Sequence, residues 1–282
     1  MPQIAHIANL WSLMRHPSKE REWSLDRKIR AVAEAGFDGF TTGLTPEHKR
    51  LADKYGLKHV LGFVSSSKPE EFSGLIQKQK DAGAVQINVQ LDDHDTPPAL
   101  AARHWLKLVR DAEKIGGVVV SLEVHRDCCT ETPEKTYEIA ERFHKATGEL
   151  IKLNFDFSHF AVVKHLAPAN YIDRLLDHPD LVKNSDQSHM RPFNGHHCQV
   201  PATDGKGHES PEIKPYLEFI NDLFACWFAG AKGGEVMYAC PEFGPVSSTY
   251  GLSTFPDVWK DAIFLRGKTE ALWKASLRKW QK

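Results

Sequence analysis

A short apolar run in the middle of the chain ends in three side chains that could do chemistry. The run, residues 118–122, is mostly valine and follows two glycines, which is typical of a strand buried on both faces. Glu123, His125 and Arg126 come directly after it. A buried strand that becomes charged only at its carboxyl end is typical of an active site in a parallel α/β sheet or barrel. The ordinary alternative is a strand that simply emerges into solvent.

Three other expected strands end in a similar way, on Asp156, His189 and Glu242. Together with Glu123 they provide three carboxylates and one imidazole. This is a set of hard oxygen ligands with one nitrogen, which suits Mn²⁺, Mg²⁺ or Co²⁺ better than a thiolate zinc site would. Each residue also has an ordinary alternative as an ion-pair partner, a helix cap, a loop histidine or an exposed glutamate. Four such residues at equivalent strand ends favour a shared function.

These side chains can meet only if their strands lie side by side. Strand and helix patterns alternate about eight times with short connections, which predicts an α/β fold: a closed (β/α)8 TIM barrel forming a single domain over residues 1–282. The carboxyl ends of all strands in such a barrel gather on one face. The expected strands are residues 4–13, 37–42, 59–64, 84–90, 118–122, 153–156, a segment within 181–190, and 235–239. The expected helices are residues 25–35, 46–55, 69–82, 98–115, 132–147, 171–176, 216–229 and 256–280, with a long loop at 191–213.

The composition excludes several classes of protein. The 36 Lys and Arg residues nearly balance the 37 Asp and Glu residues, so we do not expect a nucleic-acid partner. The five cysteines form no CxxC pair and indicate neither a disulfide framework nor a zinc knuckle. The amino terminus does not look like a signal peptide, and no apolar run is long enough for a membrane span. We therefore expect a cytoplasmic protein with no membrane contact, and a homo-oligomeric state stays open.

The order and spacing of the strand ends resemble the xylose isomerase-like TIM barrel superfamily. This is the sugar phosphate isomerase and epimerase group, which also contains endonuclease IV. The resemblance spans most of the chain, from the first strand to the eighth. The motifs that carry it are Ser121-Leu122-Glu123-Val124-His125, Asn154-Phe155-Asp156-Phe157-Ser158-His159, Ser188-His189-Met190-Arg191 and Pro241-Glu242-Phe243-Gly244-Pro245.

The resemblance implies one bound divalent metal ion, Mn²⁺, Mg²⁺ or Co²⁺, with Zn²⁺ as an alternative. Its ligands would be Glu123, Asp156, His189 and Glu242. The segment before His189 is unusually polar, so Gln187 or Asp186 is an alternative third ligand.

The substrate-binding residues implied by the resemblance are histidines and an arginine beside the ion. His159 resembles a histidine that contacts a substrate oxygen, and Arg191 resembles the arginine that follows the metal histidine. His125 would hold substrate hydroxyls with them. Apolar walls for a sugar could come from Trp11, Phe63 and Phe243. The loop Gly195-His196-His197-Cys198 could be a second metal site, but incidental exposed histidines are the favoured interpretation.

We therefore expect a metal-dependent isomerase or epimerase acting on a small-molecule sugar or keto acid through a metal-bound enediolate. Glu123 and Glu242 would move the proton as acid and base. A metal-dependent dehydratase or lyase on the same scaffold is an alternative. An endonuclease IV-like DNA-repair phosphodiesterase is less favoured, because it needs several additional histidine ligands, of which His6 is one candidate, and a basic groove. A barrel that binds a sugar or a protein partner without catalysis would keep the fold and lose the ion.

Overall fold

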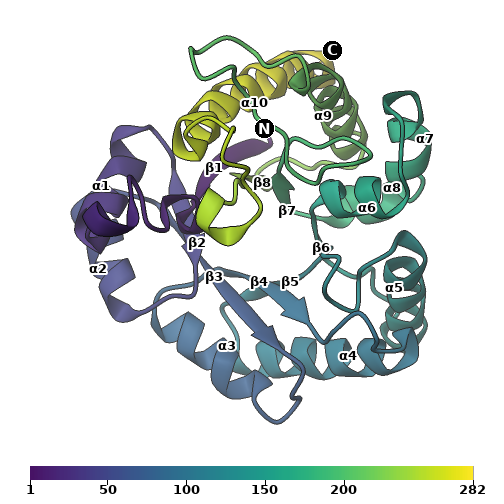
Figure 1. The fold of residues 1–282 in the computed structure, drawn as a ribbon. Coiled ribbons are helices and arrows are strands. Elements are labelled where there is room, and N and C mark those ends of the chain that lie inside the picture. Colours follow the sequence, from purple (N-terminus) through teal and green to yellow (C-terminus); the bar gives the residue numbers. More distant parts are fainter. Residues whose placement is uncertain (282) are drawn as a thin grey trace.

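Eight parallel strands close into a barrel in the computed structural model, which describes residues 1–281 (Figure 1). They follow one another around the barrel in sequence order, and β1 pairs with β8 to close the sheet. The strands are β1 (Gln3–Asn9), β2 (Gly39–Thr42), β3 (His59–Ser66), β4 (Gln86–Leu91), β5 (Val119–Glu123), β6 (Leu153–Phe155), β7 (Gln187–Met190) and β8 (Val236–Pro241). The predicted TIM barrel is thus confirmed.

Helices surround the barrel and cover the outer faces of its strands (Figure 1). They are α1 (Leu25–Glu34), α2 (Pro46–Lys54), α3 (Phe72–Asp81), α4 (Pro98–Ile115), α5 (Pro133–Thr147), α6 (Phe157–Val163), α7 (Tyr171–Leu175), α8 (Pro179–Asn184), α9 (Ile213–Phe228) and α10 (Val258–Trp280). Their ends follow local signals in the sequence. Ser24 and Thr132 cap α1 and α5 by accepting backbone hydrogen bonds, and Gly148, with φ of 78°, ends α5 in the left-handed conformation.

The interior of the barrel is divided into an apolar part and a polar part. Ile7 of β1, Leu61 of β3 and Cys240 of β8 belong to a small apolar cluster. Asn154 of β6 donates a hydrogen bond of 3.0 Å to Asn88 of β4, although these strands are not neighbours. Both amides must therefore point into the barrel, and they form part of a polar layer on the side of β4 to β7.

The structure differs from the predicted elements in three places. β1 ends at Asn9, and Leu10–Leu13 form a short 3-10 helix instead of continuing the strand. After β6 the chain turns at once into α6, because the carboxylate of Asp156 caps that helix by accepting a hydrogen bond from the backbone of Ser158. The segment before β7 is helical (α8), so the seventh strand occupies only the end of its expected range.

The long loop between β7 and α9 is anchored to the last helix. The buried carboxylate of Asp261, in the first turn of α10, accepts hydrogen bonds from the backbone of Ala202 (2.8 Å) and from the hydroxyl of Thr203 (2.7 Å). α10 also packs against β1 and β8, the two strands that close the barrel. Among residues 1–281, no helix combines the length and the apolar character needed to cross a bilayer.

A buried histidine between the barrel and α10 makes stability depend on pH. Nε2 of His6 lies 2.7 Å from Oε2 of Glu270, and burial lowers the pKa of His6 below 6.5 even though Glu270 opposes that shift. Below pH 6.5 the unfolded chain therefore binds a proton that the folded chain does not bind, and stability falls as the pH decreases.

We predict that the free energy of unfolding decreases from pH 6.5 to pH 5, and that His6→Gln reduces this slope by up to about 1.4 kcal/mol per pH unit. Urea unfolding of both proteins across this range checks the prediction. A slope that is the same in the variant and the wild type would show that His6 is not the titrating group.

Candidate functional site

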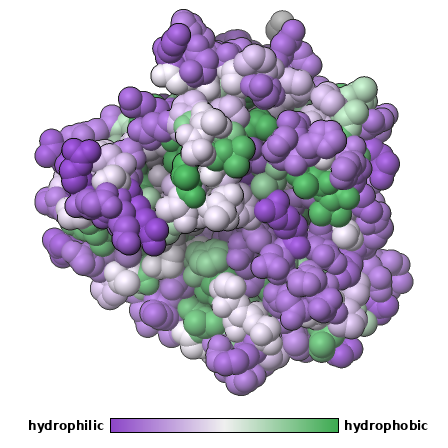
Figure 2. All heavy atoms as spheres, viewed as in Figure 1, coloured by the Kyte–Doolittle hydropathy of each residue, from purple (hydrophilic) through white to green (hydrophobic). Residues whose placement is uncertain are grey.

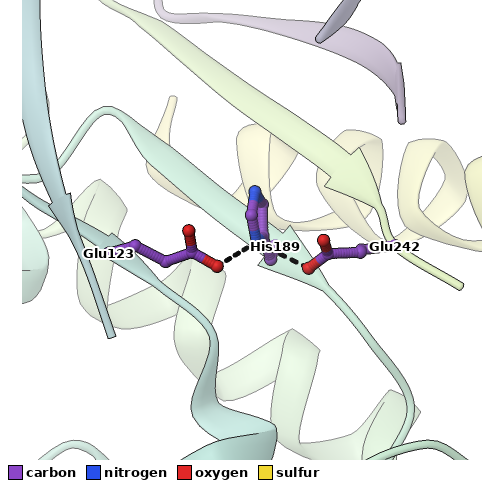
Figure 3. Close-up of side chains that lie close together, drawn as sticks. All are labelled: Glu123, His189 and Glu242. Carbon is purple, nitrogen blue, oxygen red and sulfur yellow. Dashed lines mark ion pairs between the residues drawn. The ribbon is translucent and has the colours of Figure 1, made fainter. Parts of the chain in front are cut away.

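Glu123, His189 and Glu242 meet at the carboxyl end of the barrel, although they come from β5, β7 and the segment after β8 (Figure 3). The imidazole lies between the carboxylates: its Nδ1 is 2.7 Å from Oε2 of Glu242 and 3.4 Å from Oε1 of Glu123. The other ring nitrogen, Nε2, is 2.9 Å from the amide of Asn154, so Nδ1 is the nitrogen that faces the carboxylates. All three side chains are buried, and one ligand atom from each lies within 4.8 Å of the others. The structure therefore brings three of the four predicted ligands together.

Asp156, the fourth predicted ligand, lies beside this group but has other partners. Its Oδ1 accepts the hydrogen bond from Ser158 that caps α6. Its Oδ2 lies 3.2 Å from Nη1 of Arg191 and 3.5 Å from Nε2 of His159. The second terminal nitrogen of Arg191 is 2.6 Å from Oε2 of Glu242. Arg191 thus bridges Asp156 and Glu242, and Asp156 is outside the group of three.

Two asparagines that the sequence analysis did not identify hold the glutamates in place. Asn88 of β4 donates a hydrogen bond of 2.6 Å to Oε2 of Glu123, and Asn9 at the end of β1 donates one of 2.9 Å to Oε1 of Glu242. Each carboxylate therefore has one oxygen bound to an amide, and its other oxygen faces His189. The available signal in the sequence was weak: Asn88 is one of three polar residues that alternate with apolar ones in β4, and Asn9 is the last residue of β1.

The site contains three buried carboxylates and two buried cationic side chains. Burial raises the pKa of Asp156 to about 6 even though Arg191 opposes this effect. Burial also acts to raise the pKa of Glu242, but the charges of Arg191 and His189 outweigh it and lower that pKa. For His189, burial acts to lower the pKa, but Glu242 and Glu123 outweigh it and raise the value to about 10. Each carboxylate has a cationic neighbour, but three negative and two positive groups sum to one net negative charge.

A cavity of about 650 Å³ is lined by the group of three and by residues from the opposite side of the barrel mouth. Figure 2 shows this face of the molecule hollowed near its centre. Trp11 and Phe63, two of the expected apolar wall residues, line the cavity. Phe243, the third, is instead buried in the core, where it is 1% exposed.

The predicted substrate-binding residues lie at different depths. His125 and Arg191 line the cavity. His159 is completely buried behind it, with its ring 4.3 Å from that of His125, and burial lowers its pKa well below 6.5, so it is neutral. Tyr250, from the loop after β8, also lines the cavity. No motif in the sequence pointed to this tyrosine.

The alternative third ligands lie elsewhere in the barrel. Asp186 pairs with Lys152 (3.1 Å), which precedes β6, so this carboxylate lies at the amino end of the strands, away from the cavity. Gln187 is buried in β7, and its amide atoms have no hydrogen-bond partner. Neither residue belongs to the group formed with His189.

The other histidines considered as metal ligands are also far from this arrangement. His196 and His197 are exposed and contact the side chain of Asn194. His6 pairs with Glu270 of α10, outside the barrel. Within the part of the chain that the structure describes, the group of three is the one cluster of His, Cys, Asp and Glu side chains close enough to share an ion. A three-metal site of the endonuclease IV kind therefore has no support here.

The donor set is suited to a divalent cation. Two carboxylate oxygens and the imidazole nitrogen of His189, after it releases its proton, are ligands that hard to borderline cations prefer. The net negative charge of these five buried groups also favours a bound cation. The asparagines that hold the glutamates provide the kind of supporting hydrogen bonds that orient metal ligands.

Comparison with known proteins supports the fold. A search found no family model that matches the chain, and no curated protein matches it in sequence. A sugar phosphate isomerase/epimerase from Parabacteroides distasonis has a similar structure, with a TM-score of 0.56 and 14% sequence identity over 96% of this chain and 95% of that one. A prophage protein of the dihydrodipicolinic acid synthase family from E. coli is more distant, with a TM-score of 0.39 and 14% identity over 88% of this chain and 72% of that one. The resemblance inferred from the sequence is thus confirmed at the level of the fold.

We predict that Arg191→Ala destabilises the protein by about 3 kcal/mol, because it leaves Asp156 and Glu242 buried without their shared partner. Denaturant unfolding measures the loss. Arg30→Ala, which removes an exposed pair with Glu34, is the control and should leave stability unchanged within error. Equal effects of the two substitutions would contradict a buried charge bridge.

Proposed function

We propose that this protein is a divalent-metal-dependent isomerase or epimerase that acts on a sugar or a keto acid. The observation that carries the proposal is the convergence of Glu123, His189 and Glu242 within 4.8 Å at a cavity of about 650 Å³. A cavity of this volume suits a small molecule. The fold shared with a sugar phosphate isomerase/epimerase agrees with the proposal but, at 14% identity, says nothing of the reaction.

The residues that would hold the ion are the group of three, with Asp156 proposed as a fourth ligand. A bound ion would act as a Lewis acid on two adjacent substrate oxygens and stabilise the negative charge that develops when the C–H bond between them loses its proton. Mn²⁺, Mg²⁺ and Co²⁺ suit these ligands. In the structure Asp156 is bound to Arg191, so its role as a ligand stays a prediction.

The chain itself supplies the groups that move the proton. The pKa of Glu123 and that of Glu242 are both lowered, since His189 and, for Glu242, Arg191 outweigh the opposing effect of burial. Both side chains are therefore carboxylates at neutral pH, the form that accepts a proton. Their amide partners Asn88 and Asn9 fix the direction in which they act. Arg191, between Glu242 and Asp156, would offset negative charge on the substrate.

Metal binding provides the first test. After treatment with EDTA, the wild-type protein should bind one Mn²⁺ per chain in a calorimetric titration, and Glu123→Gln or His189→Gln should weaken binding by at least about 100-fold. Glu138→Gln, at an exposed site on α5, is the matched control and should bind as the wild type does. Asp156→Asn shows whether this residue is a fourth ligand. A wild-type protein that binds no Mn²⁺ would exclude metal dependence.

Proton exchange provides the second test. Ketoses, keto-glycosides and hydroxypyruvate are incubated with the Mn²⁺-loaded protein in D₂O, and NMR follows the entry of deuterium into carbon. We predict exchange by the wild type and a loss of at least about 100-fold in Glu242→Gln, which keeps the shape of the side chain but not the base. Circular dichroism confirms that the variant is folded. Full exchange by this variant would refute the role of Glu242, and the products distinguish an isomerase from a dehydratase or lyase.

A further inference from the structure

His125 offers a hydrogen-bond donor from one defined ring nitrogen. Its Nδ1 lies 3.2 Å from the backbone nitrogen of Asp127 and 3.6 Å from the sulfur of Cys128. A backbone N–H can only donate, so Nδ1 accepts this bond and the ring hydrogen is on Nε2. The direction of the donor therefore follows from the turn after β5.

The hydroxyl of Tyr250 is the neighbour of this donor. Its oxygen lies 3.5 Å from Nε2 of His125, which is longer than the roughly 2.7–3.2 Å of a good hydrogen bond. Both residues line the cavity that contains the group of three. Two donors at this spacing are poorly placed to satisfy each other, but they can share one acceptor between them.

Tyr250 is held in this position by its surroundings. Its ring has the guanidinium groups of Arg191 and Arg126 at 5.0 and 5.1 Å from its centroid, and Trp11 meets it edge-on at 5.1 Å. Gly244 allows the tryptophan to approach, because a Cβ at that position would lie 2.4 Å from Cη2 of Trp11. The loop that carries Tyr250, yellow-green in Figure 1, lies at the barrel mouth. The two guanidinium groups also make this part of the cavity favourable for negative charge.

We propose that Nε2–H of His125 and the O–H of Tyr250 form a pair of donors that binds one substrate oxygen. This inference rests on the proposed function and assigns two groups to its reaction. When the proton of a C–H bond next to a carbonyl moves to a glutamate, the electron pair of that bond forms a C=C bond, and the π pair of the C=O bond moves onto the carbonyl oxygen. The donor pair stabilises the negative charge on that oxygen, as an oxyanion hole does. The substrate class is thus an α-hydroxy ketone or aldehyde whose carbonyl reaches the His125 side of the cavity.

Binding of glycolohydroxamate, a small mimic of an enediolate, tests the pair. Tyr250→Phe removes the hydroxyl and keeps the ring between the arginines. His125→Asn keeps an acceptor for the backbone N–H of Asp127 but has no donor at the position of Nε2. His125→Gln supplies an amide N–H near that position. We expect the Phe and Asn variants to bind the probe at least about tenfold more weakly than wild type, and the Gln variant to recover most of the affinity.

Four further measurements make the outcome unambiguous. Mn²⁺ affinity and melting temperature should not change in these variants, because neither residue is a proposed ligand. Val246→Ala, on an exposed residue of the same loop, should bind the probe as wild type does. Nitrogen-15 NMR of the wild type should show the hydrogen of His125 on Nε2.

The pair is overturned if the hydrogen is on Nδ1, if Tyr250→Phe binds the probe within about twofold of the wild type, or if the wild type does not bind it at all. Any of these results together with deuterium exchange by the wild type would remove the donor pair and leave the proposed function intact. Absence of both Mn²⁺ binding and exchange in the wild type would remove the proposed function and the donor pair with it.

Discussion

The burial of three carboxylates at one end of the barrel is the constraint on which the site depends. Glu123, Asp156 and Glu242 are removed from water, and each would be costly to bury without a charged partner. Arg191 binds two of them at once, and His189 lies between the two glutamates. A net negative charge remains after these contacts. This net negative charge makes the site costly to bury, and it also attracts a cation.

Inside the barrel, the apolar side chains that stabilise the fold lie apart from the polar side chains that hold the carboxylates of the site. The apolar cluster around Ile7 and Leu61 fills one part of the interior. The other part contains asparagines that are bonded to one another and to the carboxylates. A buried amide needs partners as much as a buried carboxylate does. Asn88 has partners for its nitrogen and its oxygen, whereas the side-chain oxygen of Asn154 has none within residues 1–281. The polar layer therefore limits how the glutamates can turn.

The fold and three of the site residues could be predicted because both follow from local patterns. Alternating strand and helix signals predict the barrel, and barrel geometry places Glu123, His189 and Glu242 at one mouth whatever their separation in sequence. Hydrogen bonds between side chains of different strands have no local signature, so Asn88 and its bond to Glu123 were missed, as was the position of Tyr250.

Short elements were harder to predict than long ones. Most residues of α6 are buried, so its sequence lacks the alternation of apolar and polar faces that indicates a helix. For Asp156, a role as helix cap and a role as metal ligand both fitted the sequence. The structure shows the cap, while the ligand role stays a prediction. The polar sequence of β7 reflects the polar interior that the strand faces, a feature that becomes visible only when all the strands are in place.

The last strand and the last helix complete both the barrel and its mouth. β8 closes the sheet against β1, Ser12 binds the backbone of Phe243 across most of the chain, and Asp261 of α10 anchors the long loop after β7. Two of these contacts, between β1 and β8 and between Ser12 and Phe243, join residues that are far apart in the sequence, and such contacts are slow to form. During synthesis on the ribosome, β1 and β7 would therefore each have an unpaired edge until β8 and α10 have emerged. The cavity at the barrel mouth would be among the last features of the molecule to take shape.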